Sequence, residues 1–226
     1  MRTAGSDAFS SRGYVRLEGF YPKARMRSIK RTLHDQLERL HAGRGLPASI
    51  RALPVFQQIG ALSKRVNVAR LHASLVTQEL HDTVADLAGR RPVRVQETQL
   101  LLSPPMQGAW TLRGLNWHVD IAADVQGPVP GVQAFFLIDD VAPHGGATLA
   151  LAGSHRRDID GSALRRTLRT SVGLELALGE MGIELVEMSG RAGDVFLMDM
   201  RVLHTPSINA AKTLRMMATA RCFLSA

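Results

Sequence analysis

The sequence predicts a mainly β protein with flanking helices, of the sandwich or jelly-roll type. Apolar residues follow the helical spacing of three and four only in an N-terminal part, over about residues 22–90. From about residue 93 to residue 224 they alternate with polar residues in short segments, which Gly, Pro and Asp separate. Many short strands joined by long excursions favour a sandwich or jelly roll, and the helices would then cover one outer face.

Composition indicates a folded chain with one domain over residues 1–226. Of these 226 residues, 45% are hydrophobic, which is enough for one sizeable core. The single cysteine, Cys222, excludes an internal disulfide and a thiolate metal site, and it fits a reducing compartment. The N-terminus lacks an apolar core of signal-peptide length, and no apolar run approaches the roughly 20 residues of a membrane span. We therefore expect a cytoplasmic protein that does not enter a membrane.

The formal net charge of +8 predicts an electrostatic preference for anions. Nucleic acid is not the expected anion, because the chain has no basic run of that type and its 5% of aromatic residues is too few for a base-stacking platform. An anionic small-molecule substrate would fit, and the arginines of residues 156–170, a predicted loop and short helix, would attract it at an active-site mouth. The alternatives are a solvated charged turn and an arginine bias that reflects a GC-rich genome.

Two segments of the N-terminal part are predicted helices. In the first, residues 22–45, Pro22 marks the start and Gly43 lies beyond the end. Its apolar face consists of Met26, Ile29, Leu33, Leu37 and Leu40. The second helical segment covers residues 65–90 and closes at Gly89. Its apolar positions are Val68, Leu71, Leu75, Leu80, Val84 and Leu87.

The second part of the chain contains the strand candidates. They are residues 93–102, 114–122, 132–141, 147–153, 182–190, 193–200 and 213–223. Gln99 alternates with apolar residues in the first of them. If its side chain faces inward it needs a polar partner, and it would line a substrate pocket. The alternative is the outer face, paired with a helix.

A candidate metal site begins with the segment NWHVDIA, which contains His118 and Asp120. On a strand, residues two apart point to the same face, about 7 Å apart, so both side chains can reach one ion. His204, after the apolar strand at 193–200, is the candidate third ligand, because the other histidines lie in helical segments, in a turn or at a strand end. Two imidazoles and one carboxylate suit non-haem Fe(II) with open coordination positions. A zinc hydrolase uses the same ligand types, and a surface ion pair is the simplest alternative.

Arg215 separates an oxygenase from a hydrolase. It opens the strand candidate after His204, where an inward-facing guanidinium would be a costly buried charge unless it meets an anion. The two-pronged guanidinium matches a carboxylate. A 2-oxo dicarboxylate that chelates iron would supply that carboxylate at its far end. The alternative is a surface-facing arginine on an edge strand.

Four stretches of the sequence resemble the phytanoyl-CoA dioxygenase family. They are RGYVRLEGFYPKARM at 12–26, HVD at 118–120, DDVAPHGGATLALAGSH at 139–155 and GRAGDVFLMDMRVLHTPSINAAKTLRMM at 190–217. The third is the most specific, since it combines an acidic strand end, a Gly-Gly turn, a short strand and GSH in that order. The family consists of Fe(II)- and 2-oxoglutarate-dependent oxygenases on a double-stranded β-helix, a cupin-like jelly roll. The resemblance covers about residues 12–223.

The resemblance implies a role for each matching residue. His118, Asp120 and His204 would bind Fe(II), and Arg215 would hold the distal carboxylate of 2-oxoglutarate, with O2 as the second cosubstrate. Further contacts to 2-oxoglutarate would come from Thr148, Asn116 and Phe135. Because Asp120 is present, the chain does not match the halogenating relatives, which have glycine or alanine there.

Two positions depart from the family pattern. Pro206 stands where many members have a serine, and Ser103 stands where many have a lysine. Both departures affect expected contacts to the cosubstrate and leave the three metal ligands in place.

The function predicted from these observations is oxidation of an unactivated C–H bond in a small molecule, by hydroxylation or a related reaction, in bacterial secondary or specialised metabolism. Desaturation, cyclisation and epoxidation use the same site. The alternatives from other classes are a catalytically silent jelly-roll binding protein and a metal-dependent hydrolase.

Overall fold

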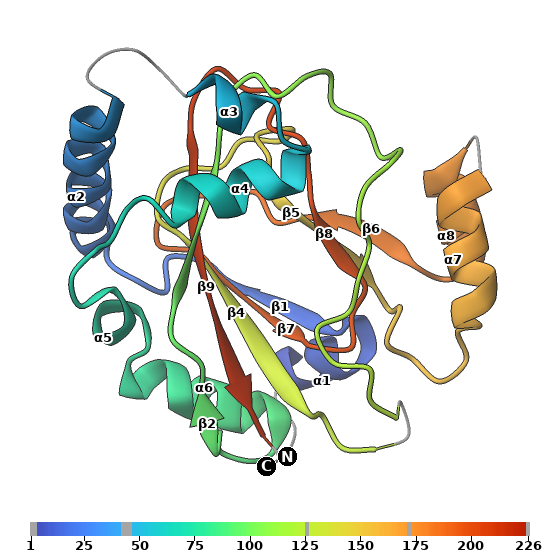
Figure 1. Cartoon of the computed structure of the whole chain (residues 1–226). Coiled ribbons are helices and arrows are strands. Elements are labelled where there is room, and N and C mark those ends of the chain that lie inside the picture. Colours follow the sequence, from blue (N-terminus) through green and yellow to red (C-terminus); the bar gives the residue numbers. More distant parts are fainter. Residues whose placement is uncertain (1–3, 42–46, 125–126, 171–172, 225–226) are drawn as a thin grey trace.

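The computed structural model describes residues 4–41, 47–124, 127–170 and 173–224, and two antiparallel sheets form its centre (Figure 1). The six-stranded sheet has the order β1 (Tyr14–Leu17), β7 (Val195–Asp199), β4 (Gly131–Leu137), β9 (Arg215–Phe223) and β2 (Arg94–Val95), with β3 (Gln99–Ser103) also paired to β9. The three-stranded sheet has the order β6 (Glu184–Glu187), β5 (Thr148–Ala152) and β8 (His204–Pro206). This arrangement confirms the predicted mainly β class. Over the described residues the two sheets stay separate and do not close into a barrel.

The two sheets pack against each other through an apolar layer. Phe135 of β4 and Met198 of β7 share a buried cluster with Ala150 of β5. The opposite face of the larger sheet contributes Val132 and Leu197 to a second cluster, which also contains helical residues. Each central strand of the larger sheet is therefore buried on both faces.

Strand β9 shows how the two-residue period positions polar side chains. Ala218 and Ala220 belong to the cluster that faces the helices, whereas Met217 belongs to the cluster between the sheets. Residues two apart share a face, so odd-numbered positions of β9 point toward the space between the sheets. Arg215, Thr219 and Arg221 are the polar residues at these odd positions.

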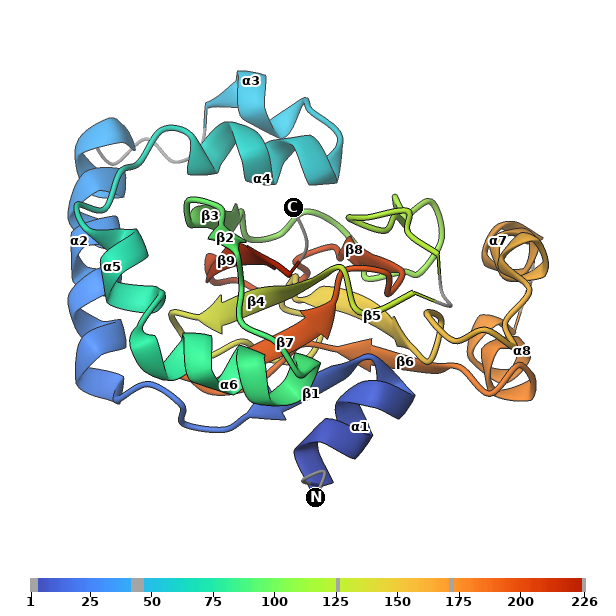
Figure 2. The ribbon, with the colours of Figure 1, turned by 90° about the horizontal axis from the view of Figure 1, so that it is seen from below.

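Three helices cover the outer face of the larger sheet, α2 (Lys23–His41), α5 (Leu71–Leu75) and α6 (Gln78–Ala88) (Figure 2). The predicted apolar positions Met26 and Leu33 of α2, and Leu80 and Val84 of α6, are buried there. Gly89 ends α6 with a left-handed φ of 73°, as its position in the sequence predicts. Within the described residues, no helix combines the length and the apolar character that crossing a membrane requires.

The expected cover of one outer face holds for the helices predicted in residues 22–90, but the chain has helices elsewhere too. The predicted short helix in 156–170 is α7 (Gly161–Thr170), and with α8 (Leu174–Glu180) it packs beside the smaller sheet through a third apolar cluster. Four helices were not predicted, namely α8, α1 (Ala4–Arg12), α3 (Ala48–Arg51) and α4 (Val55–Ser63).

Two predicted strands are shorter or less regular than expected. Residues 93–102 divide into β2 and β3 because the main-chain N–H of Thr98 donates to His72 Nδ1 of α5, at 3.2 Å, and not to a neighbouring strand. Residues 114–122 form only one β-bridge, His118 with His204. The partner strand β8 has three residues, and the N–H groups of Asp120 and Ile121 both donate to Met200 O, so the ladder stops after one bridge.

The predicted helices differ from the observed ones in two details. Residues 65–90 form α5 and α6 as separate helices, because Thr77 caps α6 by accepting a hydrogen bond from Leu80 N. Leu40, predicted on the apolar face of α2, is 46% exposed. Gly43, predicted beyond the end of that helix, lies outside the described residues.

Candidate metal centre

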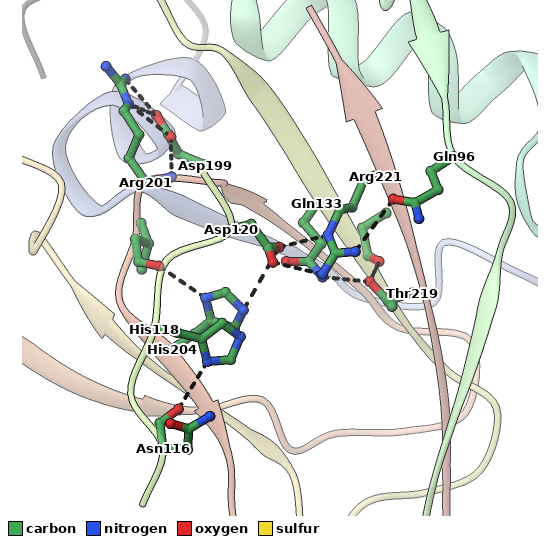
Figure 3. A network of polar contacts seen from close by, with 12 residues as sticks. Gln96, Asn116, His118, Asp120, Gln133, Asp199, Arg201, His204, Thr219 and Arg221 are labelled. Atoms are coloured by element: carbon green, nitrogen blue, oxygen red, sulfur yellow. Dashed lines mark hydrogen bonds and ion pairs between the residues drawn. The ribbon is translucent and has the colours of Figure 1, made fainter. Parts of the chain in front are cut away.

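The structure brings His118, Asp120 and His204 together between the two sheets (Figure 3). The main chains of His118 and His204 form a reciprocal pair of hydrogen bonds, 3.0 and 2.9 Å long, which places the two imidazoles side by side. Their ring centroids are 4.3 Å apart. One possible ligand atom of each of the three side chains lies within 4.8 Å of the others. A single metal ion can therefore be reached by all three.

Both histidines are oriented by main-chain carbonyl groups. His118 Nδ1 lies 2.9 Å from Asn116 O, and His204 Nδ1 lies 3.0 Å from Val202 O. A carbonyl oxygen only accepts hydrogen bonds, so each Nδ1 carries the proton and each Nε2 keeps its lone pair for a metal. Burial, together with the nearby His118, lowers the pKa of His204 to about 4, so this imidazole is neutral at pH 7.

The carboxylate of Asp120 is held by Arg221 of β9. Arg221 Nε donates to Oδ2 at 3.0 Å and Nη2 donates to Oδ1 at 2.7 Å, while Nη1 donates to Gln96 Oε1 at 3.4 Å (Figure 3). Asp120 Oδ2 also lies 3.9 Å from His204 Nε2. Asp120 therefore has the arginine on one side and the histidine pair on the other.

A cavity of about 760 Å³ adjoins these residues. Its walls come from both sheets, from α4 and from the segment before α5. Seven residues predicted from the sequence for the site line it, namely Gln99, Asn116, His118, Phe135, Thr148, His204 and Arg215. The eighth, Asp120, contacts the lining residue Arg221. The structure thus gathers the predicted set around one volume.

Arg215 is buried in the wall of this cavity. It is 3% exposed, and its guanidinium donates to two main-chain carbonyls, Nε to Gly146 O at 2.7 Å and Nη1 to Leu101 O at 2.8 Å. Burial alone lowers its pKa, to about 9, so it stays positively charged at pH 7. Among the described residues no carboxylate forms an ion pair with it. A buried cation that is only partly compensated by carbonyl dipoles favours an anionic ligand in the cavity.

The remaining predicted residues occupy distinct positions around the cavity. Phe135 is buried, and its ring meets that of His204 edge-on at 6.1 Å between centroids. Thr148 is buried opposite Pro206 in the β5–β8 ladder. Asn116 and Gln99 are exposed residues, so they lie where the cavity opens. Thr148 and Phe135 thus belong to the interior, and the two amides belong to the mouth.

Of the two positions that depart from the family pattern, Pro206 lines the cavity and Ser103 does not. Ser103 donates its hydroxyl hydrogen to Gln107 Oε1 at 3.1 Å and does not line the cavity. Pro206 lines the cavity, and the neighbouring Ser207 turns its hydroxyl to Ala147 O at 2.7 Å. Neither Ser103 nor Ser207 therefore offers its hydroxyl to the cavity in this structure.

Sequence reasoning missed several polar residues of the cavity wall, and three of them, Gln133, Thr219 and Arg221, lie on β4 and β9 of the larger sheet. The Thr219 hydroxyl donates to Ala134 O at 2.9 Å, so its oxygen accepts from Gln133 Nε2 at 3.0 Å. This chain of donors fixes the orientation of the Gln133 amide. Its Oε1 is buried and has no hydrogen-bond partner among the described residues. The two-residue period of β9, starting from Arg215, would have indicated Thr219 and Arg221, whereas nothing in the sequence marks Gln133.

A second and larger hollow, of about 1090 Å³, lies between residues 110–117 and helices α7 and α8. Arg113, Arg165 and Arg169 line it together with Trp117. Asn116 lines both this hollow and the smaller cavity. Part of the predicted arginine-rich segment 156–170 therefore lies next to the cavity mouth.

Solved structures with a similar fold include non-heme alpha ketoglutarate dependent enzymes. AviO1 from Streptomyces viridochromogenes Tue57 superposes with a TM-score of 0.63 at 18% identity, over 99% of this chain and 95% of that chain. The non-heme alpha ketoglutarate dependent carbocyclase SnoK from nogalamycin biosynthesis gives 0.65 at 18% identity, over 99% and 84%. The epimerase SnoN in complex with Fe3+, alpha ketoglutarate and nogalamycin RO gives 0.61 at 19% identity, over 97% and 82%. At these identities the likeness establishes the fold.

The sequence itself matches one family model over nearly its whole length. No curated protein sequence shows significant similarity to the chain. The model of phytanoyl-CoA dioxygenase, however, matches residues 9–217, which include the histidines, the aspartate and Arg215 described above. The chain belongs to the phytanoyl-CoA dioxygenase family.

Proposed function

We propose that the protein is an Fe(II)- and 2-oxoglutarate-dependent oxygenase that oxidises an unactivated C–H bond of a small molecule. The proposal rests on one observation: the two histidines of a His118–Asp120–His204 cluster line the same cavity as a buried arginine that has no carboxylate partner among the described residues. It is supported by the family and by the neighbour SnoN, whose structure contains Fe3+ and alpha ketoglutarate.

The ligand set fits iron. His118 and His204 present the lone pair of Nε2, Asp120 presents a carboxylate oxygen, and one ligand atom of each lies within 4.8 Å of the others. Positions toward the cavity stay open for a cosubstrate and for O2. Bound Fe(II) would supply the one-electron chemistry that activates O2, with 2-oxoglutarate as the source of further electrons.

The other wall residues fit 2-oxoglutarate. Arg215 would bind its distal carboxylate, which would complete the compensation of the buried charge. The Thr148 hydroxyl and the Asn116 amide would hydrogen-bond the cosubstrate, and Phe135 would flank it. The volume of about 760 Å³ lies within the range typical of small-molecule sites, so a substrate fits beside the cosubstrate.

Hydroxylation is the reaction we propose, with specialised bacterial metabolism as its setting. The neighbours include a carbocyclase and an epimerase from nogalamycin biosynthesis, which shows that the fold supports several outcomes. Halogenation is not proposed, because the chain has Asp120 where the halogenating relatives have glycine or alanine. The reducing cytoplasm, which suits both Fe(II) and the single buried thiol of Cys222, is the compartment we propose.

The substrate we propose is an anionic small molecule that also offers a hydrogen-bond donor. Arg113, Arg165 and Arg169 beside the cavity mouth would attract the anionic part. The unpaired Gln133 Oε1 would accept a hydrogen bond from an O–H or N–H group, which 2-oxoglutarate as a dianion lacks. Gln99 at the opening is the further substrate contact that we propose.

Oxygen-dependent release of succinate tests this function. The Fe(II) protein is incubated in air with 2-oxoglutarate and a panel of matched anionic and neutral compounds, while succinate and product mass are followed together. We expect equal amounts of succinate and oxidised product for at least one compound, with a gain of 16 mass units, the mass of one oxygen atom. A hydrolase would instead give water-addition products without O2, and a silent binding protein would release no succinate.

A substitution at the cavity wall tests the substrate class. Gln133→Met keeps the size of the side chain and removes the acceptor, so we expect KM for a donor-bearing substrate to rise about fivefold, from the loss of one hydrogen bond worth about 1 kcal/mol. The 2-oxoglutarate requirement should not change. An unaltered KM would exclude Gln133 from substrate binding.

A further inference from the structure

Arg221 meets the Asp120 carboxylate in a fork, with one N–H on each oxygen, at 3.0 and 2.7 Å. The Asp120 side chain is 7% exposed and that of Arg221 is 27% exposed, so the pair is largely shielded from water. A two-point contact fixes both the position and the rotation of the carboxylate plane, which a single hydrogen bond does not. Gln96 Oε1 accepts from the third nitrogen, Nη1, and so steadies the guanidinium.

This ion pair is compatible with metal binding by the same carboxylate. Each carboxylate oxygen has two lone pairs, and the fork uses one on each. The Oδ2 atom that accepts from Arg221 Nε is also the one that lies 3.9 Å from His204 Nε2. Figure 3 shows Asp120 between the two partners, with contacts to the arginine on one side and to the histidine on the other. A lone pair of Asp120 can therefore face the metal position while Arg221 stays bound.

Arg221 exerts two opposite effects on a cation bound there. Its positive charge repels the cation, whereas its grip on Asp120 places a ligand in the binding geometry before the metal arrives. Outer residues that orient ligands typically contribute 10- to 100-fold to metal affinity. With Asp120 present, its negative charge lies next to the guanidinium and offsets the repulsion, so the orienting effect should win. Without Asp120 only the repulsion remains.

We infer that Arg221 is a positioning residue of the metal centre, which orients Asp120 for coordination through the two-point ion pair. This inference rests on the proposed function, because it assumes that Asp120 is a metal ligand. It assigns Arg221 a task different from that of Arg215, although both are arginines on the same face of β9. Arg215 would bind the cosubstrate, and Arg221 would bind a ligand of the metal.

A double-mutant cycle with Co(II) as the probe tests the inference without substrate or cosubstrate. The metal-free protein is titrated with Co(II) alone, as wild type, Arg221→Met, Asp120→Gly and the double variant. We expect Arg221→Met to weaken Co(II) binding by about 10- to 100-fold in the wild-type background. In the Asp120→Gly background the same change should leave Co(II) affinity unaltered or strengthen it, because the orienting partner is gone and a repelling charge is removed.

Two further variants separate orientation from charge and from folding. Arg221→Lys keeps the charge and loses the fork, so it should recover less than a third of the lost affinity on a logarithmic scale. Arg16→Met is the matched control, since Arg16 Nη2 donates to the buried Asp194 at 2.7 Å in a similar but remote pair, with side chains 36% and 4% exposed. It should lower thermal stability and leave Co(II) affinity as in wild type. Thermal unfolding of every variant shows whether it is folded at the temperature of the titration.

The outcomes distinguish this inference from the proposed function. If wild type binds no Co(II), or binds it equally well after His118→Ala and His204→Ala, the proposed metal centre itself is wrong. If wild type binds Co(II) through the histidines and Arg221→Met leaves the affinity unchanged, only the role of Arg221 is wrong. An equal loss in both backgrounds, or full recovery by Arg221→Lys, would also contradict positioning. If Arg221→Met is unfolded, Arg221→Lys serves as the test, because lysine keeps the positive charge and loses the two-point contact to Asp120. Co(II) affinity equal to that of wild type in Arg221→Lys would then contradict positioning.

Discussion

His118→Ala and His204→Ala are each expected to abolish turnover and to reduce binding of Fe(II) at the site below detection at micromolar protein. The two imidazoles supply two of the three ligands, and their ring centroids are 4.3 Å apart. The cluster contains only one other described side chain, that of Asp120, so neither imidazole has a substitute there. Iron content after anaerobic loading and desalting, measured with succinate release, checks this expectation. His34→Ala, which alters an exposed histidine of α2, is the control and should retain iron and activity.

Retention of one iron per chain and of full activity in either variant would remove these histidines from the metal centre. Loss of iron in the His34→Ala control would point to general destabilisation instead. Thermal unfolding of the metal-free proteins separates the two cases, because a variant that is folded at the temperature of iron loading and still lacks iron has lost a ligand and not its fold.

Arg215→Ala is expected to weaken 2-oxoglutarate binding by at least roughly a hundredfold while metal binding stays nearly intact. Removing one partner of a buried, hydrogen-bonded ion pair costs on the order of 3–5 kcal/mol, and each 1.4 kcal/mol corresponds to about a tenfold change in affinity. Arg215→Lys should recover only part of this loss, since lysine keeps the charge and lacks the fork. Calorimetric titration of the Co(II) protein with 2-oxoglutarate measures the difference.

Arg215→Ala should also lower the stability of the folded protein. Arg215 donates to the main-chain carbonyls of Gly146 and Leu101, and alanine leaves both without this donor. Some loss of thermal stability is therefore expected together with the loss of affinity. An Arg215→Ala protein that is folded and binds 2-oxoglutarate as well as wild type does would contradict the assignment of Arg215.

Much of the candidate site could be predicted because it depends on the identity and the order of a few residues. Two ligand types two residues apart, a distant histidine after an apolar strand and an arginine in the next strand are visible without a structure. His118 and Asp120 were nevertheless predicted on a strand, and the structure shows a single bridge. The two-residue spacing holds through hydrogen bonds to His204 of β8 and to Met200 before it, and the sequence pattern does not reveal how short β8 is.

Other parts depend on contacts between distant residues, which one sequence does not reveal. Arg221 and Arg215 both fit the inward face of β9, but only the fold shows that Arg221 meets Asp120. The break between β2 and β3 depends on a hydrogen bond from Thr98 N to His72, a residue of a helix. Helix α4 forms part of the cavity wall and has nine residues, too few turns for its apolar period to be recognised, although Pro54 directly before it is a typical start signal.

The central claim, that one cavity binds both Fe(II) and 2-oxoglutarate, is tested most directly by anaerobic titration of the Fe(II) protein with 2-oxoglutarate. Chelation of Fe(II) by the 2-oxo acid produces a metal-to-ligand charge-transfer band in the visible spectrum, and no substrate is needed to see it. We predict that wild type develops this band and saturates at submillimolar 2-oxoglutarate, whereas Arg215→Ala shows no band at the same concentration. A wild-type protein that binds Fe(II) but shows no band at millimolar 2-oxoglutarate would contradict the account.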